Sequence, residues 1–142
     1  MSVNAPGLLS RDEEQRLGTA GVALAMEALQ RLEAGLQTLP DKPEETTASA
    51  LRALWLLAAG SAVSATLATE SPLAALGAAE TDRFRLLIQR RLDGVPLAHL
   101  TERQHFMGLE MLAGPGALIP RHETEIVGRA AVRLARRLAE EQ

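Results

Sequence analysis

The sequence predicts a mainly α-helical fold, with a short β-hairpin and one further helix towards its C-terminal end. Apolar residues recur at three- and four-residue spacing along most of the chain, which is the period of an amphipathic helix. Aromatic residues are only 2% of the 142 residues while hydrophobic residues are 46%, so the core must be built mainly from Leu, Ala, Val and Ile. Only residues 94–125 combine glycines, prolines and short apolar runs in the pattern of strands and turns.

The first helix is predicted to begin after Ser10. The Ser10 hydroxyl and the Glu13 carboxylate have the spacing of a capping box, in which each side chain satisfies a free backbone N–H. Gly18 and Gly21 lie inside this helix and indicate either close helix packing or a kink. Its apolar face is predicted to hold Leu17, Gly21, Leu24, Ala28, Leu32 and Leu36.

A second helix is predicted to follow the break at residues 38–43. Asp41 is the expected cap, with Pro43 in the first turn and Glu44 three residues after the cap. This helix is expected to run to about Ala59. Its buried residues are predicted to be Leu51, Leu54, Trp55 and Ala58. Trp55 is the only tryptophan, and it is either a packing residue of the core or a hot spot for a partner protein.

Shorter elements are expected in the middle of the chain. Gly60 should end the second helix, residues 61–69 should form about two helical turns, and Ser71-Pro72 should restart a short helical segment. Another helix should open at Glu80 or Thr81 and end at Gly94. Its apolar face is predicted to hold Phe84, Leu87, Ile88 and Leu92. Its arginines form either a solvated face or a patch for an acidic protein partner.

The C-terminal elements are predicted from Gly, Pro and short apolar runs. Residues 97–101 read as one helical turn, and residues 104–107 and 110–112 as two strands that turn near Gly108. Residues 117–119 should be extended because Pro120 follows them. The last helix should begin around Glu123. Its apolar stripe is predicted to hold Ile126, Val127, Ala130, Ala131, Leu134 and Leu138.

Composition excludes several classes of function. A net charge of -3 argues against nonspecific binding of nucleic acid, whose phosphates attract basic surfaces. The sequence has no cysteine, which excludes disulfides and thiolate metal sites and fits a reducing cytoplasm. No apolar run reaches the roughly 18–20 residues that span a bilayer, and the N-terminus lacks the pattern of a signal peptide. We therefore expect a cytoplasmic protein without nucleic-acid or membrane partners.

Side chains with catalytic or metal-binding potential are few. His99, His105 and His122 do not have the spacing of metal ligands, so no metal site is predicted. Glu123 and Glu125 would lie on different faces of a helix, which makes a paired-carboxylate site improbable. Their simpler interpretation is that acidic residues complement the dipole at a helix start. No catalytic residue is predicted in this chain.

The stretch from Gly94 to Glu125 resembles the release factor glutamine methyltransferase family (HemK-type). The residues that carry the resemblance are Gly94-Val95-Pro96, His105-Phe106-Met107-Gly108 and Leu118-Ile119-Pro120-Arg121-His122-Glu123-Thr124-Glu125. The last eight match the family pattern at all positions but His122, where the family has proline. Val95 also departs from the pattern, because an acidic residue is usual there.

The resemblance implies S-adenosylmethionine as the cofactor of the intact enzyme and a glutamine side chain, in a peptide chain release factor, as its substrate. It implies that Phe106 forms an apolar wall near the methyl-transfer site. It further implies that Pro120, Arg121, Glu123 and Thr124 brace the cofactor and substrate pocket. The glycine-rich turn and the Asn-Pro-Pro-Tyr motif of the family do not occur in the sequence, so this chain alone is expected neither to bind the cofactor nor to transfer a methyl group.

With this resemblance, the chain is expected to divide into four parts. They are a flexible tail (1–9), a helical substrate-recognition domain (10–100), a β-hairpin linker (101–120) and the first helix of an absent Rossmann-like methyltransferase domain (121–142). The expected partners are a release factor and the catalytic domain, with a homodimer through the hairpin or the last helix as a further possibility. The alternative is a free-standing, non-catalytic interaction module derived from such an enzyme.

Overall fold

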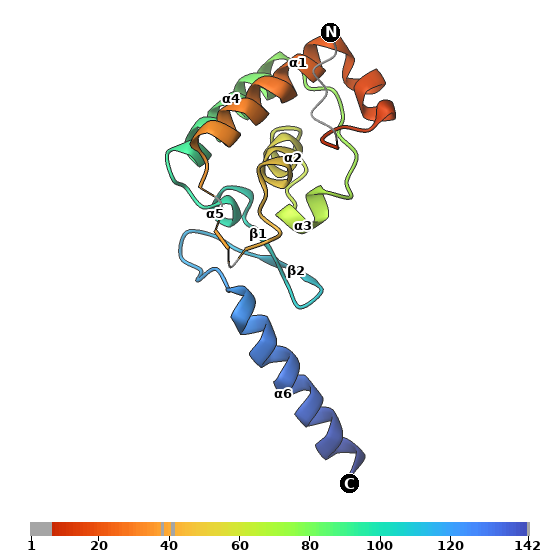
Figure 1. Cartoon of the computed structure of the whole chain (residues 1–142), viewed down its shortest axis with the longest axis vertical. Helices are drawn as coiled ribbons and strands as arrows, with labels where there is room; N and C mark the ends of the chain where they lie inside the picture. Colours follow the sequence, from red (N-terminus) through yellow and green to blue (C-terminus); the bar gives the residue numbers. More distant parts are fainter. Residues whose placement is uncertain (1–6, 38, 41, 142) are drawn as a thin grey trace.

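The computed structural model describes residues 7–37, 39–40 and 42–141. Its elements, in chain order, are α1 (Arg11–Gly35), α2 (Thr47–Ala58), α3 (Ala65–Ala68), α4 (Ala78–Leu92), α5 (Leu97–Thr101), β1 (Arg103–Phe106), β2 (Leu109–Leu112) and α6 (His122–Glu140). Helices α1 to α5 form one body around α2, the hairpin lies at its lower end, and α6 projects away from it (Figure 1). The mainly helical fold with a hairpin is therefore confirmed.

The predicted start of α1 is confirmed. The Ser10 N–H donates to Glu13 Oε2 at 2.9 Å and the Glu13 N–H donates to Ser10 Oγ at 3.2 Å, which completes a capping box. Gly18 breaks the helical geometry with a φ of +66°, so the helix bends there. Glycine adopts this left-handed conformation without the steric cost of a Cβ atom. The kink is one of the two structural interpretations that the sequence allows.

The predicted start of α2 is wrong. Asp41 lies outside the described residues, and Pro43 and Glu44 precede the helix rather than open it. Thr46 is the cap: its Oγ1 accepts from the Ser49 N–H at 3.0 Å, while its own N–H donates to Ser49 Oγ at 2.9 Å. The Ser49 hydroxyl also contacts the Glu44 carbonyl at 2.7 Å, which holds the preceding residues in a non-helical path.

The core of the helical body is centred on α2. Trp55 and Phe84 are fully buried, and their rings meet edge to face with centroids 5.0 Å apart. This geometry is favoured by the quadrupoles of the two rings. Because Trp55 is fully buried, it is a packing residue rather than an exposed hot spot.

The segment between α2 and α4 is less helical than predicted. Within residues 61–69 only the four residues of α3 are helical, and residues 72–77 have no regular secondary structure. Two contacts from distant helices hold this non-helical path: Trp55 Nε1 donates to the Ala74 carbonyl at 2.8 Å, and the Leu73 N–H donates to Glu13 Oε1 at 3.0 Å. Tertiary contacts therefore override the local helical signal of Ser71-Pro72.

A buried ion pair connects α1, α2 and the non-helical segment that follows α3. Arg52 Nη2 lies 2.6 Å from Glu13 Oε1, and the same guanidinium donates to the carbonyls of Leu8, Ala68 and Ser71. Burial opposes ionisation of Glu13, but the hydrogen bonds from Arg52 and from two backbone N–H groups outweigh it and lower its pKa to about 2. Leu8 is itself buried. Leu8 belongs to the tail of residues 1–9 expected from the sequence, of which residues 1–6 lie outside the described part of the chain.

Helix α4 begins at Ala78, two or three residues before the predicted start. The Glu80 carboxylate accepts a hydrogen bond from the Gly77 N–H at 2.8 Å, so Glu80 caps the helix from within its first turn. Phe84, Leu87 and Ile88 are buried as predicted. The predicted end is also confirmed, because Gly94 adopts a φ of +97° directly after the helix.

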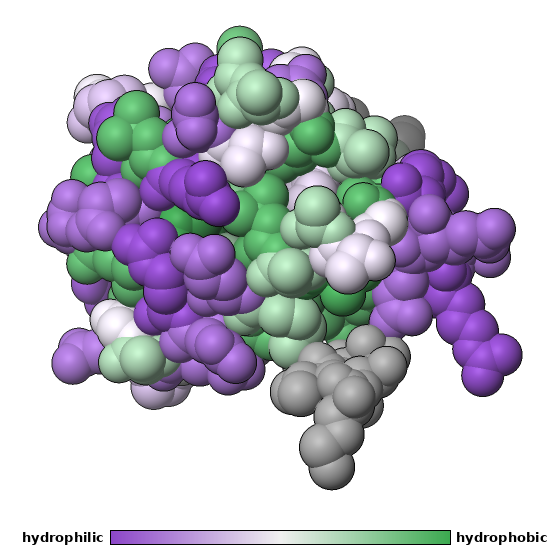
Figure 2. All heavy atoms as spheres, turned by 90° about the horizontal axis from the view of Figure 1, so that it is seen from above, coloured by the Kyte–Doolittle hydropathy of each residue, from purple (hydrophilic) through white to green (hydrophobic). Residues whose placement is uncertain are grey.

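The hairpin and α6 follow the prediction closely. Strands β1 and β2 pair antiparallel, with Phe106 opposite Leu109, so the loop consists of Met107 and Gly108. The one-turn helix α5 leads into this hairpin. The apolar stripe predicted on α6 is largely uncovered: Val127 is 69% exposed and Leu134 is 59% exposed. Seen from above, the helical body shows hydrophobic residues through the middle of its surface with hydrophilic residues around them (Figure 2).

Candidate functional site

A hollow of about 200 Å³ lies where the hairpin, the start of α6 and the segment before α2 come together. We refer to it as the junction groove. Its lining residues are Pro43, Glu44, Thr66, Gln104, His105, Phe106, Pro120, Arg121, His122, Glu125 and Arg129. Segments that are up to 86 positions apart (43 to 129) thus contribute to one surface.

Three of the five residues singled out from the sequence line the junction groove. They are Phe106 at the end of β1 and Pro120 and Arg121 directly before α6. Glu123 and Thr124 do not line it, although they follow directly in the first turn of α6, where both are exposed. Thr124 is joined to Arg121 by a backbone hydrogen bond of 3.0 Å. The bracing role expected for these residues stays a prediction.

Glu125 joins α6 to the hairpin. Its Oε1 accepts a hydrogen bond of 2.9 Å from the Met107 N–H, and its Oε2 lies 3.3 Å from Arg129 Nη2. The Met107 N–H holds the pKa of the Glu125 carboxyl below its usual value. Partial burial opposes this effect, whereas the hydrogen bond and charge of Arg129 and the electrostatic interaction with His122 act in the same direction as the Met107 N–H. Glu125 is therefore a carboxylate at neutral pH.

Glu110 joins the other side of the hairpin to the helical body. One carboxylate oxygen accepts from the Ser64 N–H at 2.6 Å and the other accepts from the Ser64 hydroxyl at 2.7 Å. Ser64 is buried and caps α3. This pair of hydrogen bonds to an ionised acceptor fixes the distance between β2 and α3. Two carboxylates thus hold the hairpin, Glu125 at its loop and Glu110 on β2.

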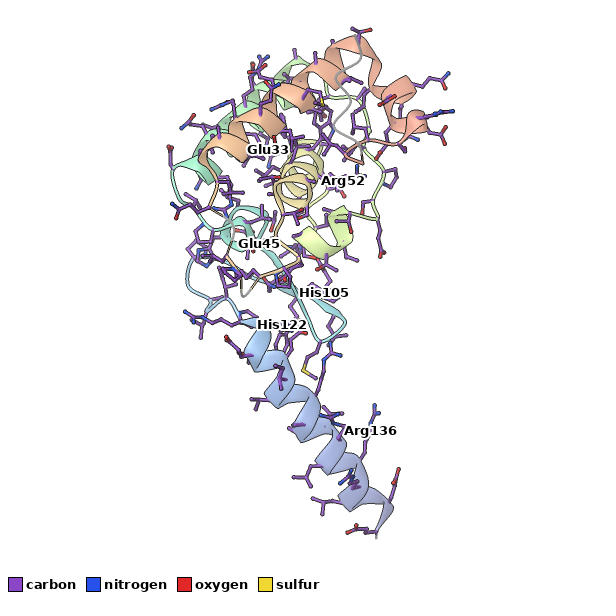
Figure 3. The ribbon with its side chains drawn as sticks, viewed as in Figure 1. Glu33, Glu45, Arg52, His105, His122 and Arg136 are labelled. Carbon is purple, nitrogen blue, oxygen red and sulfur yellow. The ribbon has the colours of Figure 1, made fainter. Side chains whose placement is uncertain are left out.

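Two histidines lie at the junction. His105 belongs to β1 and His122 begins α6, and Figure 3 shows both at the place where the hairpin meets that helix. His99 lies elsewhere, with Nε2 3.3 Å from the Ala117 carbonyl. Among the described residues there is no group of three or more His, Cys, Asp or Glu side chains that could hold a metal ion.

The lining of the junction groove is mostly polar. Glu44, Arg121, His122, Glu125 and Arg129 place both signs of charge around one apolar ring, that of Phe106. Such a surface suits a polar peptide segment, because its side chains and backbone offer donors and acceptors for both charges. A volume of about 200 Å³ is enough for one or two side chains and is below the roughly 300–1,000 Å³ of typical small-molecule pockets.

Sequence reasoning did not identify Glu110 or Glu125 as site residues. Glu125 was interpreted only as an acidic residue that complements a helix dipole. Its partner, the Met107 N–H, is 18 positions away in the sequence. The two groups meet because of the path of the hairpin, which the local pattern of the helix does not report. The only sequence signal was its place as the last residue of the stretch that resembles a known family.

The sequence was compared with known proteins. Over 63 residues, which are 44% of this chain and 22% of the relative, it is 38% identical to the release factor glutamine methyltransferase of Shewanella oneidensis. Part of this chain is similar to release factor glutamine methyltransferases. The enzyme of that name from Moorella thermoacetica is 44% identical over 57 residues, 40% of this chain and 20% of the relative. The Escherichia coli enzyme is 47% identical over 49 residues, 34% of this chain and 18% of the relative.

The similarity to release factor glutamine methyltransferases is limited in extent. The matched stretch covers about a fifth of the length of these three relatives, at 22%, 20% and 18%. No family model matches the sequence. None of the helices in the described ranges has the length and apolar character that crossing a membrane requires.

Proposed function

We propose that this chain is the substrate-recognition part of a protein methyltransferase that acts on a glutamine side chain of a peptide chain release factor. The observation that supports the proposal most strongly is the similarity to enzymes of that name, at 38% to 47% identity. In this proposal the protein works in the cytoplasm, where release factors act.

The junction groove is the proposed contact surface for the substrate. It brings Phe106 together with Pro120 and Arg121, from segments that are separate in the sequence. An apolar ring beside charged groups suits a glutamine segment, since the aliphatic stem packs on the ring and the polar groups bind the peptide around it. In this arrangement Phe106 also excludes water from the side of the amide that must be methylated.

We expect the junction groove not to hold S-adenosylmethionine on its own. The groove is small, at about 200 Å³, and eight of its eleven lining residues are charged or polar. When bound to an intact enzyme, this cofactor supplies the methyl group. The role proposed for the residues present is to bind and orient the protein substrate, and the purified 142-residue chain is expected to transfer no methyl group.

The uncovered face of α6 favours this proposal over a self-sufficient interaction module. A free-standing module should bury its apolar stripe or pair it in a dimer. Within this chain the stripe is not buried, since Val127 and Leu134 are 69% and 59% exposed, which leaves pairing in a dimer as the way for such a module to cover it. An exposed apolar face of this length suits contact with another domain. Light scattering tests the choice: a monomer mass that is independent of concentration, without binding of a hydrophobic dye, would favour the module.

The proposed function is tested by titrating the chain with a bacterial peptide chain release factor in a calorimeter. We expect saturable binding that is weakened in Phe106→Ala and unchanged in Leu86→Ala. Leu86 is a matched control because it is an apolar residue that is 61% exposed on α4, away from the groove. Absence of binding by the unaltered chain, or equal binding by the two variants, would contradict the proposal.

A further inference from the structure

The loop of the hairpin has a backbone conformation that is unusual for one of its residues. Met107 and Gly108 have φ values of +51° and +83°, the pattern of a type I′ turn. Glycine accepts this conformation freely, but methionine is strained there and needs support from its surroundings. In such a two-residue loop the N–H of the first loop residue also lies outside the hydrogen-bond ladder between the strands.

Helix α6 supplies the partner for that N–H. Glu125 Oε1 accepts from the Met107 N–H at 2.9 Å, and Arg129 holds the other oxygen at 3.3 Å. The bond is charge-assisted, because the acceptor is ionised. It acts on the peptide unit that links Phe106 to Met107, so it fixes the orientation of that peptide plane directly after Phe106.

The side chain of Met107 contacts the same side of α6. A Cβ atom at Gly128 would collide with Met107 Sδ, so the absence of a side chain at Gly128 leaves room for the methionine. Glu125 and Gly128 are three residues apart and therefore neighbours on the helix surface. The strained turn is thus held at two points, one at its backbone and one at its side chain.

The geometry points to Glu125 as a positioning residue that fastens the hairpin turn to α6 and thereby sets the position of Phe106 in the junction groove. The attachment of the turn to α6 follows from the contacts of Met107. Its effect on substrate binding rests on the proposed function. Since Val127 and Leu134 are mostly exposed, the first turns of α6 provide the attachment rather than its apolar stripe.

Hydrogen exchange of the Met107 amide, measured by NMR on the whole chain, tests this inference. In Glu125→Ala we expect about tenfold faster exchange, the change that corresponds to loss of a hydrogen bond of about 1.4 kcal/mol. Glu125→Gln keeps a carbonyl acceptor and should restore part of the protection. Glu140→Ala removes a carboxylate from the last turn of the same helix and should leave the exchange rate unchanged.

A second variant tests the side-chain contact. Gly128→Val should displace the Met107 side chain, speed exchange of the Met107 amide and shift the amide signal of Phe106. Unchanged exchange in Glu125→Ala, or the same acceleration in Glu140→Ala, would overturn the inference. These measurements do not involve the substrate. If the exchange results are as expected but the chain does not bind a release factor, only the proposed function is refuted.

Discussion

Arg52 and Glu13 form a buried ion pair with 2.6 Å between Nη2 and Oε1. The guanidinium of Arg52 also donates to backbone carbonyls before α1, at the last residue of α3 and after α3. One side chain of α2 thus connects the segment before α1 with the end of α3 and the segment after it, which also contribute Leu8, Ala68 and Leu73 to the hydrophobic core. The helical body that carries the hairpin depends on this network.

Removal of Arg52 should destabilise the fold strongly. Arg52→Met leaves the Glu13 carboxylate buried without its charged partner, which costs about 3–5 kcal/mol in comparable cases. The free energy of unfolding from urea titration checks this value. Arg83→Met is the control, because Arg83 is exposed on α4, and it should change stability by less than about 0.5 kcal/mol. Equal stability of the two variants would contradict the role of the network.

The stability of the chain should fall in acid through Glu13. Its pKa is about 2 in the folded chain and 4.5 without the fold, so the folded state favours the ionised form. The resulting stabilisation, on the order of 3 kcal/mol, is fully present above about pH 4.5 and is lost as the pH falls towards 2. Urea titrations from pH 6 to pH 2 should show a shallower pH dependence in Glu13→Gln than in the unaltered chain. A dependence that is identical in both proteins would exclude Glu13 as the cause.

The edge-to-face pair of Trp55 and Phe84 should be essential to the core. Phe84→Ala removes a fully buried ring and should lower the free energy of unfolding by about 3–5 kcal/mol. Trp55 is the only tryptophan, so its fluorescence reports both the unfolding and the loss of the neighbouring ring. Leu86→Ala, at a site 61% exposed on the same helix, should lower the free energy of unfolding far less. An equal loss of stability in the two variants would contradict the burial of Phe84 in the core.

Glu110 should hold the hairpin against the helical body. In Glu110→Ala both hydrogen bonds to Ser64 are lost, and we expect the local stability of the hairpin to fall by about 1–3 kcal/mol. Hydrogen exchange of the strand amides provides the measurement, with Glu70→Ala as an exposed carboxylate control. If the strand amides of Glu110→Ala stay protected from exchange, the hydrogen bonds between β1 and β2 are enough to stabilise the hairpin without Glu110.

Elements whose signals are local were predictable from the sequence. The capping box of Ser10 and Glu13, the left-handed glycine at position 94 and the turn near Gly108 each depend on a few adjacent residues. The start of α2 was not predictable in this way, because Asp41 and Thr46 both have the character of a cap. The structure favours Thr46 through its reciprocal hydrogen bonds with Ser49 and the further contact of Ser49 with the Glu44 carbonyl.

Features that depend on distant residues were missed. Residues 72–77 are not helical, and Trp55 and Glu13 bind their backbone from other helices; no local pattern reports such contacts. For the site, the family resemblance indicated Phe106, Pro120 and Arg121, which do meet at the junction groove. It did not reveal the role of Glu125, because that role is defined by a backbone N–H of the hairpin.

The most direct measurement is an NMR titration of the ¹⁵N-labelled chain with a bacterial peptide chain release factor. If the junction groove recognises this substrate, the amide signals of residues 104–106 and 121–122 should shift or broaden first, in proportion to the added release factor. Signals of the exposed residues around Arg83 on α4 should stay in place and serve as the internal control. No perturbation at all, or perturbation confined to α4 and the far end of α6, would contradict the proposed recognition role of the groove.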